Sequence, residues 1–179
     1  MKPRATIEEF FNGKRGDSIF LPPIFVLGLS VALESGQDIN SMVAIDSSPI
    51  DVALSYIISL LLSLALTFLF VVLVHPWLTK TIGRLWNGKA TSPQIANVFS
   101  LALIPHFLIL AYQILAILAQ IDPSQSYMNA GVDFILYLVS LRILLIGISV
   151  IQEFSYGFAL LNLLMTALPY LLVSLIINS

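Results

Sequence analysis

The chain has 179 residues, of which 58% are hydrophobic and only 10% are charged, and its mean hydropathy is +0.96. That little polar surface cannot cover a water-soluble domain of this size, so the composition excludes a soluble protein and predicts an integral membrane protein. The chain contains no cysteine, which excludes disulfides and thiolate metal sites. The net charge of −2 says less than the position of each charge along the chain.

A short amphipathic helix is predicted at the N-terminus, in residues 3–15. Thr6 and Glu9 form a capping-box pattern, and the apolar residues around them fall on one helical face. Two placements stay open. The helix lies in the plane of the cytoplasmic leaflet, where Lys14 and Arg15 meet anionic headgroups, or it docks on the cytoplasmic face of the protein itself.

The predicted fold is all-α, a polytopic membrane protein with a bundle of five transmembrane helices. A span needs about 20 predominantly apolar residues to cross the hydrocarbon. The first predicted span is the weakest, because its uninterrupted apolar run is short and needs its flanking residues to cross. The five predicted spans, which form one domain over residues 1–179, are residues 18–35, 49–75, 93–120, 132–151 and 157–177.

Prolines predict where the helices start and bend. In Ser48-Pro49 and in Ser92-Pro93, the serine is the predicted N-cap and the proline is the first helical residue. Pro105 lies near the middle of the third span, where its missing amide predicts a kink.

The distribution of charge predicts the orientation in the membrane. Residues 75–93, here named the basic hinge, carry Lys80, Arg84 and Lys89 and no acid, and short loops rich in Lys and Arg stay in the cytoplasm. All charged residues in the segment 34–51 are acidic, so this segment is predicted to form an outside loop. We therefore expect a cytoplasmic N-terminus and a C-terminus on the outer side.

A candidate polar site inside the membrane centres on Arg142, at the middle of the fourth span. An arginine there costs about 2.5–3.5 kcal/mol on the insertion scale, so it must face a partner or water. The candidate partners in the third span are His106, Tyr112, Gln113 and the carbonyl groups freed by Pro105. Arg142 either coordinates a solute or ion, or tethers the third helix to the fourth; we favour the tether.

A candidate charge cluster at the cytoplasmic boundary combines one acid with four cations: Glu153, Arg84, Lys89, Lys80 and Arg15. Glu153 follows the fourth span in a tight inside turn, at the depth of the basic hinge. We expect a structural ion pair between Glu153 and either Arg84 or Lys89.

No arrangement of residues points to catalysis or to a bound cofactor. A nucleophile beside a base and paired carboxylates facing one cavity are both absent. Residues 83–90 match the spacing of a phosphate-binding loop, but Ala90 replaces the hydroxyl that would hold magnesium, and no strand precedes the glycines. His75 and His106 lie at different depths without an acid at ligand spacing. We expect no enzyme activity, no cofactor and no metal.

Several features follow one another along the chain in an order that is similar to a known family. They are the short amphipathic start at residues 3–7, Gly83 and Gly88 in the basic hinge, Pro105, and the stretch 141–160. In this order the chain resembles the Yip domain family, multi-pass membrane proteins named for their interaction with Ypt/Rab GTPases. The resemblance covers nearly the whole chain and implies a five-helix bundle in a bacterial inner membrane. The N-terminal segment is too short to grip a GTPase as the eukaryotic members do.

Three functional hypotheses follow. The first is a non-enzymatic scaffold of the Yip type that organises the membrane, with lipid, further copies of itself or an unidentified membrane or cytoplasmic protein as partners, and no nucleic acid. The second is a small transporter or channel with a polar path around Arg142, His106 and Gln113. The third is binding of anionic lipid by the basic hinge.

Overall fold

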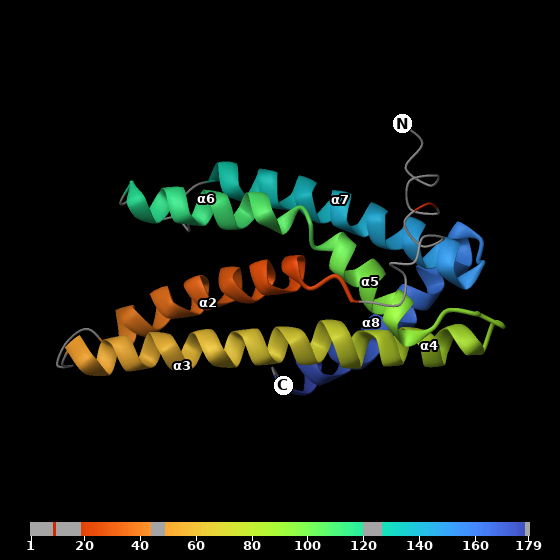
Figure 1. Cartoon of the computed structure of the whole chain (residues 1–179), viewed down its shortest axis with the longest axis horizontal. Helices are drawn as coiled ribbons and strands as arrows, with labels where there is room; N and C mark the ends of the chain where they lie inside the picture. Colours follow the sequence, from red (N-terminus) through yellow and green to blue (C-terminus); the bar gives the residue numbers. More distant parts are fainter. Residues whose placement is uncertain (1–8, 10–18, 44–48, 120–126, 178–179) are drawn as a thin grey trace. The chain divides into compact units, whose positions relative to one another are not determined.

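The computed structural model describes residues 9, 19–43, 49–119 and 127–177 (Figure 1). Among these residues the regular structure is helical throughout and includes no strand, which confirms the all-α fold. The predicted N-terminal helix, apart from Glu9, and with it Arg15, lies outside the described residues, as does Ser48. The helices are α2 (Pro22–Val43), α3 (Pro49–Phe68), the π-helix η1 (Leu69–Val74), α4 (His75–Arg84), α5 (Ser92–Ala102), α6 (His106–Leu118), α7 (Tyr127–Gln152) and α8 (Tyr156–Ile177).

Three helical stretches among the described residues are long and apolar enough to cross a membrane: Ile50–Arg84, Gly131–Gln152 and Tyr156–Ile176. A fourth span results if α5 and α6 count as one interrupted helix. The predicted total of five is therefore not reached. The first predicted span stays a prediction, because the apolar part described for α2 covers only Pro22–Ala32.

Helix α2 does not coincide with the predicted first span, residues 18–35, at either end. Helix α2 begins at Pro22 rather than at 18, because a proline disfavours helical geometry in the residue before it and fits the first turn. The carbonyl of Leu21 accepts hydrogen bonds from Ile24 N–H (2.9 Å) and Phe25 N–H (3.2 Å), which closes that turn. The helix then continues to Val43, into the predicted outside loop, because no further proline interrupts it.

The predicted start of the basic hinge at His75 is also wrong. The helix runs through Pro76 and ends at Arg84, so the connection to α5 covers only residues 85–91. A proline inside an α-helix lacks the amide donor, and its ring clashes with the carbonyl four residues earlier. Here that carbonyl belongs to Val72, inside the π-helix Leu69–Val74. The wider π turn accommodates the proline and lets the helix continue.

The third predicted span is interrupted where Pro105 predicted a kink. Helix α5 ends at Ala102 and α6 begins at His106. Helix α5 begins at Ser92, but its cap differs from the predicted one. Gln94 Oε1 accepts the Thr91 N–H at 2.9 Å, which is the reciprocal half of a capping box whose first residue is Thr91 and not Ser92.

The chain divides into two compact units, each described by itself. Unit 1 contains the described residues of Met1–Phe20, Val71–Ala102 and Leu141–Ser179. In this unit α4 packs against α5 and α8. Its buried apolar core is formed by Ala90, Ile95, Val98, Ile148 and Ala159.

Unit 2 contains Leu21–Phe70 and Leu103–Ser140. Here α2 packs along α3 and also contacts α6 (Figure 1). A Cβ atom added at Gly28 would lie 3.2 Å from the Leu64 Cα atom, so the glycine permits the close approach of α2 to α3.

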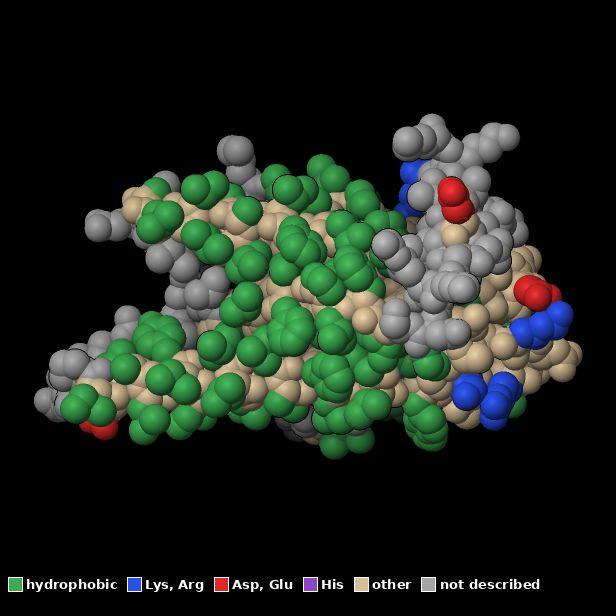
Figure 2. Space-filling view, in the orientation of Figure 1, with side chains coloured by type: hydrophobic (Ala, Val, Ile, Leu, Met, Phe, Trp, Pro, Cys, Tyr) green, Lys and Arg blue, Asp and Glu red, His purple; other side chains and the backbone are tan. Residues whose placement is uncertain are grey.

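Most hydrophobic and most charged side chains lie over different elements. Figure 2 shows hydrophobic side chains over the visible faces of α2 and α3, and Lys, Arg, Asp and Glu side chains around the end of α4 and the connection that follows it. Large apolar side chains such as Leu61 (62% exposed) and Leu171 (58% exposed) have no cover within the chain. This exposure fits a protein whose helices are solvated by lipid.

Candidate functional site

The candidate site lies in unit 1, where the α4–α5 connection (residues 85–91) meets the turn between α7 and α8 (residues 153–155). Each segment begins at the C-terminal end of a helix, where backbone carbonyl groups lack partners inside the helix. After α4, the Gly88 N–H donates to the Gly83 carbonyl (2.9 Å) and the Asn87 N–H donates to the Arg84 carbonyl (3.2 Å). This pair of bonds is the Schellman motif, with Asn87 in the left-handed conformation at φ 60°.

The same motif ends α7. The Phe154 N–H donates to the Ser149 carbonyl (2.9 Å) and the Glu153 N–H donates to the Val150 carbonyl (3.3 Å). Glu153 is in the left-handed conformation at φ 59°, a position where glycine is usual. The Ser149 hydroxyl also donates to the Phe154 carbonyl at 2.7 Å, which closes the turn from the other side.

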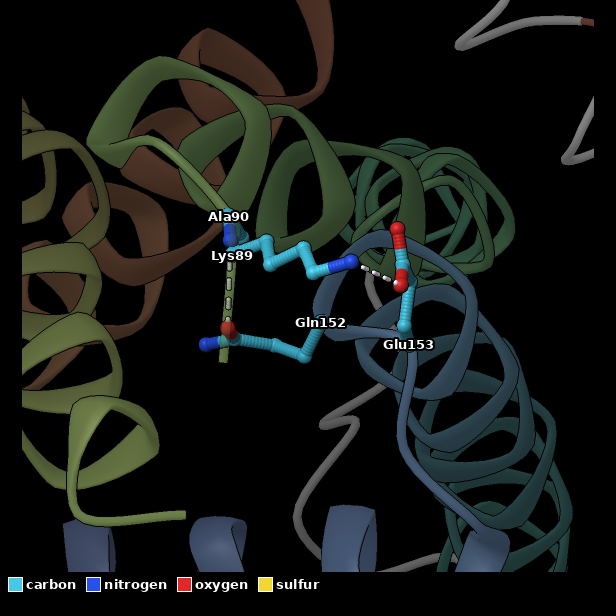
Figure 3. Close-up of polar contacts among 4 residues, drawn as sticks. All are labelled: Lys89, Ala90, Gln152 and Glu153. Carbon is cyan, nitrogen blue, oxygen red and sulfur yellow. Dashed lines mark hydrogen bonds and ion pairs between the residues drawn. The ribbon is translucent and has the colours of Figure 1, made fainter. Parts of the chain in front are cut away.

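Gln152 joins the two helix ends. Its side chain is 1% exposed, and its Oε1 atom accepts the Ala90 N–H at 3.2 Å (Figure 3). A Cβ atom added at Gly83 or Gly88 would collide with the Gln152 side-chain amide. The two glycines therefore leave the space that this amide fills.

A layer of buried polar side chains continues from Gln152 into α4 and α8. Thr79, Asn162 and Thr166 are between 0% and 3% exposed. Thr79 of α4 and Thr166 of α8 approach each other with their hydroxyl oxygens 3.4 Å apart, and the Thr166 hydroxyl donates to the Asn162 carbonyl at 2.8 Å. Hydroxyls in this position link neighbouring helices where water is scarce.

Two donors of this layer face the same glycine. Gln152 Nε2 and Asn162 Nδ2 are buried and have no hydrogen-bond partner in the described structure. A Cβ atom at Gly83 would lie 2.9 Å from Asn162 Nδ2 and would also meet Gln152 Nε2. The layer, named here the amide layer (Thr79, Gln152, Asn162 and Thr166), consists of neutral groups that bind and position backbone but cannot act as a general acid or base at neutral pH.

The predicted ion pair of the charge cluster is present with Lys89. Lys89 Nζ lies 2.7 Å from Glu153 Oε2 (Figure 3). Both side chains are largely exposed, at 69% and 62%, so the pair contributes at most about 1 kcal/mol to stability. Among the described residues, Lys80 and Arg84 form no ion pair.

Three aromatic rings pack together where the α4–α5 connection meets the turn between α7 and α8. The Trp86 ring lies 6.5 Å from that of Phe154 and 6.2 Å from that of Phe158, measured between ring centroids. Phe154 and Phe158 are themselves 6.3 Å apart. Trp86 comes from the α4–α5 connection and its partners come from the α7–α8 turn and from α8, so the contact again holds the two connections together.

The amide layer is the part of the site that sequence reasoning missed. The resemblance drew attention to Gly83 and Gly88, but the sequence did not single out Gln152, the residue that needs them. One signal was present. Asn162 and Thr166 are four residues apart in an otherwise apolar helix, so they lie on one face and mark it as facing other polar groups.

The candidates of the third span are found in unit 2, each with local contacts. Gln113 Oε1 accepts a hydrogen bond from the Ser30 hydroxyl at 2.6 Å, which joins α6 to α2. His106 is buried, and its ring meets that of Tyr137 edge-on at 5.8 Å. Tyr112 is exposed, and Pro105 is buried at the break between α5 and α6.

Arg142 belongs to unit 1, in the middle of the candidate span Gly131–Gln152. Its side chain is exposed and makes no hydrogen bond or ion pair within the part of the chain that the structure describes. Its assignment to a tether or to a polar path stays a prediction.

Within the described ranges, no three His, Asp or Glu side chains cluster in a way that could hold a metal ion. Comparison of the chain with protein families, with curated proteins and with solved structures found no match.

Proposed function

We propose that this chain is a non-enzymatic integral membrane protein that acts as a scaffold, with its N-terminus and the α4–α5 connection in the cytoplasm. The observation that carries the proposal is the small buried share of its candidate spans. Only 28%, 22% and 18% of the most apolar 18-residue windows of Ile50–Arg84, Gly131–Gln152 and Tyr156–Ile176 are buried within the chain. Helices exposed to this extent offer wide surfaces to lipid and to other membrane helices.

The polar chemistry of unit 1 agrees with a structural role. The side chains that converge there are amides and hydroxyls, and Gln152 binds a backbone amide while Thr166 binds a backbone carbonyl. Such contacts make one end of the unit rigid. A rigid end on lipid-exposed helices suits a protein that holds partners in place, and the order of features that resembles the Yip family supports the same role.

Further copies of the chain are the proposed first partner, and crosslinking tests this directly. The chain has no cysteine, so each introduced cysteine is the single thiol of the protein. Leu61→Cys and Leu171→Cys place it on exposed faces of α3 and α8, while Ala159→Cys places it at a position that is 0% exposed. We expect a bismaleimide to produce dimers in native membranes from at least one exposed position and none from Ala159→Cys.

Monomers only, from both Leu61→Cys and Leu171→Cys, would contradict self-association through these faces. The scaffold would then need a different membrane protein as its partner. Crosslinking of Ala159→Cys at the same yield as the exposed positions would mean random collision, which equally contradicts the proposal.

A small transporter or channel is the second candidate function, and Arg142 is the observation that favours it. An exposed arginine at mid-span, without a hydrogen bond to the rest of the described chain, requires water, a lipid headgroup or a solute. Liposomes that contain the purified protein alone separate the two functions. Solute or ion flux that Arg142→Ala abolishes would replace the scaffold proposal, and no flux above that of empty liposomes would leave the scaffold in place.

A further inference from the structure

The outward face of α4 combines one aromatic residue with two cations at headgroup depth. Helix Ile50–Arg84 has 35 residues, which at 1.5 Å per residue is about 52 Å, well beyond the roughly 30 Å of hydrocarbon. No charged residue lies between Asp51 and Lys80. Asp51 lies at the start of this helix and the cations Lys80 and Arg84 lie in α4, so α4 is the cationic end that emerges into a headgroup layer.

The packing of α4 determines which side chains face outward. Pro76, Thr79 and Gly83 are buried, toward α5 and α8, and the contact between the Thr79 and Thr166 hydroxyls holds this face inward. On the side of α4 next to this buried face, Trp77 is 62% exposed, Arg84 is exposed and Lys80 is half-exposed.

The cations of this face are available to a ligand. Lys80 and Arg84 are four residues apart, which places their Cβ atoms about 6 Å from each other on one side of the helix. Neither forms an ion pair with any described residue, and no acid occurs in the sequence between Asp51 and Asp122. Lys89 differs, because Glu153 neutralises it at 2.7 Å.

We propose that the outward face of α4 binds the phosphate of one anionic phospholipid, such as phosphatidylglycerol, between Lys80 and Arg84. The guanidinium of Arg84 offers two parallel donors to phosphate oxygens, and Lys80 adds a point charge beside it. Trp77 lies three residues before Lys80 and seven before Arg84, on the same face, where its ring packs at the boundary between headgroups and acyl chains. The inference depends on membrane integration alone and not on the scaffold role.

The assay measures tryptophan fluorescence, and the chain contains two tryptophans, Trp77 and Trp86. Trp86→Phe keeps an aromatic ring beside Phe154 and leaves Trp77 as the single fluorophore. The protein is reconstituted in phosphatidylcholine vesicles that contain, at equal mole fraction, either brominated phosphatidylglycerol or brominated phosphatidylcholine. Bromine quenches a tryptophan only at contact distance, so quenching reports the lipid next to Trp77. We expect the anionic lipid to quench more strongly at low mole fraction.

Substitution separates a specific site from a general attraction. With each cation near the surface contributing about 1 kcal/mol, Lys80→Gln with Arg84→Gln lowers the relative association constant of the anionic lipid by about thirtyfold. The matched control is Lys89→Gln, which removes a cation already paired with Glu153 and leaves the preference unchanged.

Three results would overturn the proposal: equal quenching by both lipids, an unchanged preference in the double variant, or an equal loss in Lys89→Gln. Circular dichroism of the variants confirms their helix content. If the double variant does not fold, a salt titration of the Trp86→Phe protein replaces it. The preference for the anionic lipid must fall as salt screens the cations. A preference that does not depend on salt contradicts the site. Cysteine crosslinking is a separate readout, so failure of this site leaves the scaffold proposal untouched.

Discussion

Gly147 provides the sharpest test of how α7 packs against α5 in unit 1. A Cβ atom at Gly147 would lie 2.9 Å from Val98 Cγ2 and 3.2 Å from Val98 Cβ. Val98 is 1% exposed, and a β-branched side chain has little freedom to rotate away. Overpacking of this kind costs about 1–3 kcal/mol. Gly147→Ala must therefore separate the two helices or distort one of them.

Gly131 is the matched control on the same helix, because no atom lies within 4 Å of a Cβ added there. Replacing a helical glycine by alanine stabilises by about 1 kcal/mol in either position. The difference between the two variants therefore isolates the clash. We expect the free energy of unfolding of Gly147→Ala to be about 1–3 kcal/mol below that of Gly131→Ala.

The assay is unfolding in mixed micelles by titration with sodium dodecyl sulfate, followed by circular dichroism. Val98→Ala in the Gly147→Ala background makes room for the new methyl group, and we expect a favourable coupling energy of about 0.5–3 kcal/mol in the double-mutant cycle. Equal stability of Gly147→Ala and Gly131→Ala would refute the packing of these two helices. So would a cycle without coupling.

Three further variants test other contacts by the same titration. Glu153→Gly and Glu153→Ala both lose the ion pair with Lys89, but only glycine relieves the left-handed conformation, which costs about 1–2 kcal/mol, so the glycine variant should be the more stable; the reverse order would contradict the turn geometry. Gln152→Ala removes the acceptor of the Ala90 N–H and should lower the free energy of unfolding by about 1–3 kcal/mol; no loss would mean that another group binds this amide. Gly28→Ala should destabilise by about 1–3 kcal/mol, because its Cβ atom meets the backbone of Leu64; a neutral result would show that α2 and α3 are farther apart.

Local signals predicted the helix boundaries that depend on local chemistry. Pro49 begins α3, Pro105 interrupts the third span, and the turn after Gln152 separates α7 from α8, as the sequence indicated. Prolines mark the first two positions, and the polar residues Gln152, Glu153 and Ser155 between two apolar stretches mark the third. The length of α2 was not predictable in this way, because the polar residues between 34 and 43 continue the helix without a proline to stop it, and Gly36 alone does not end it.

Two features were beyond sequence reasoning for physical reasons. Pro76 normally marks the end of a helix, and only the wider hydrogen bonding of the π turn before it allows continuation, which no residue type announces. By contrast, the ion pair of Glu153 was predictable, because position and charge limited its partner to Arg84 or Lys89. Gln152 was missed because its partner is the backbone amide of Ala90, which leaves no trace in side-chain patterns.

The two Schellman motifs bear on how the protein adapts to bilayers of different thickness. Backbone carbonyl groups that rely on water fix the depth of a helix end, since drawing them into hydrocarbon costs several kcal/mol each. At the ends of α4 and α7 the carbonyls of Gly83, Arg84, Ser149 and Val150 are satisfied by neighbouring amides. The backbone at this end of unit 1 therefore does not fix its depth in a thicker or thinner membrane, and the charged side chains Arg84, Lys89 and Glu153 do.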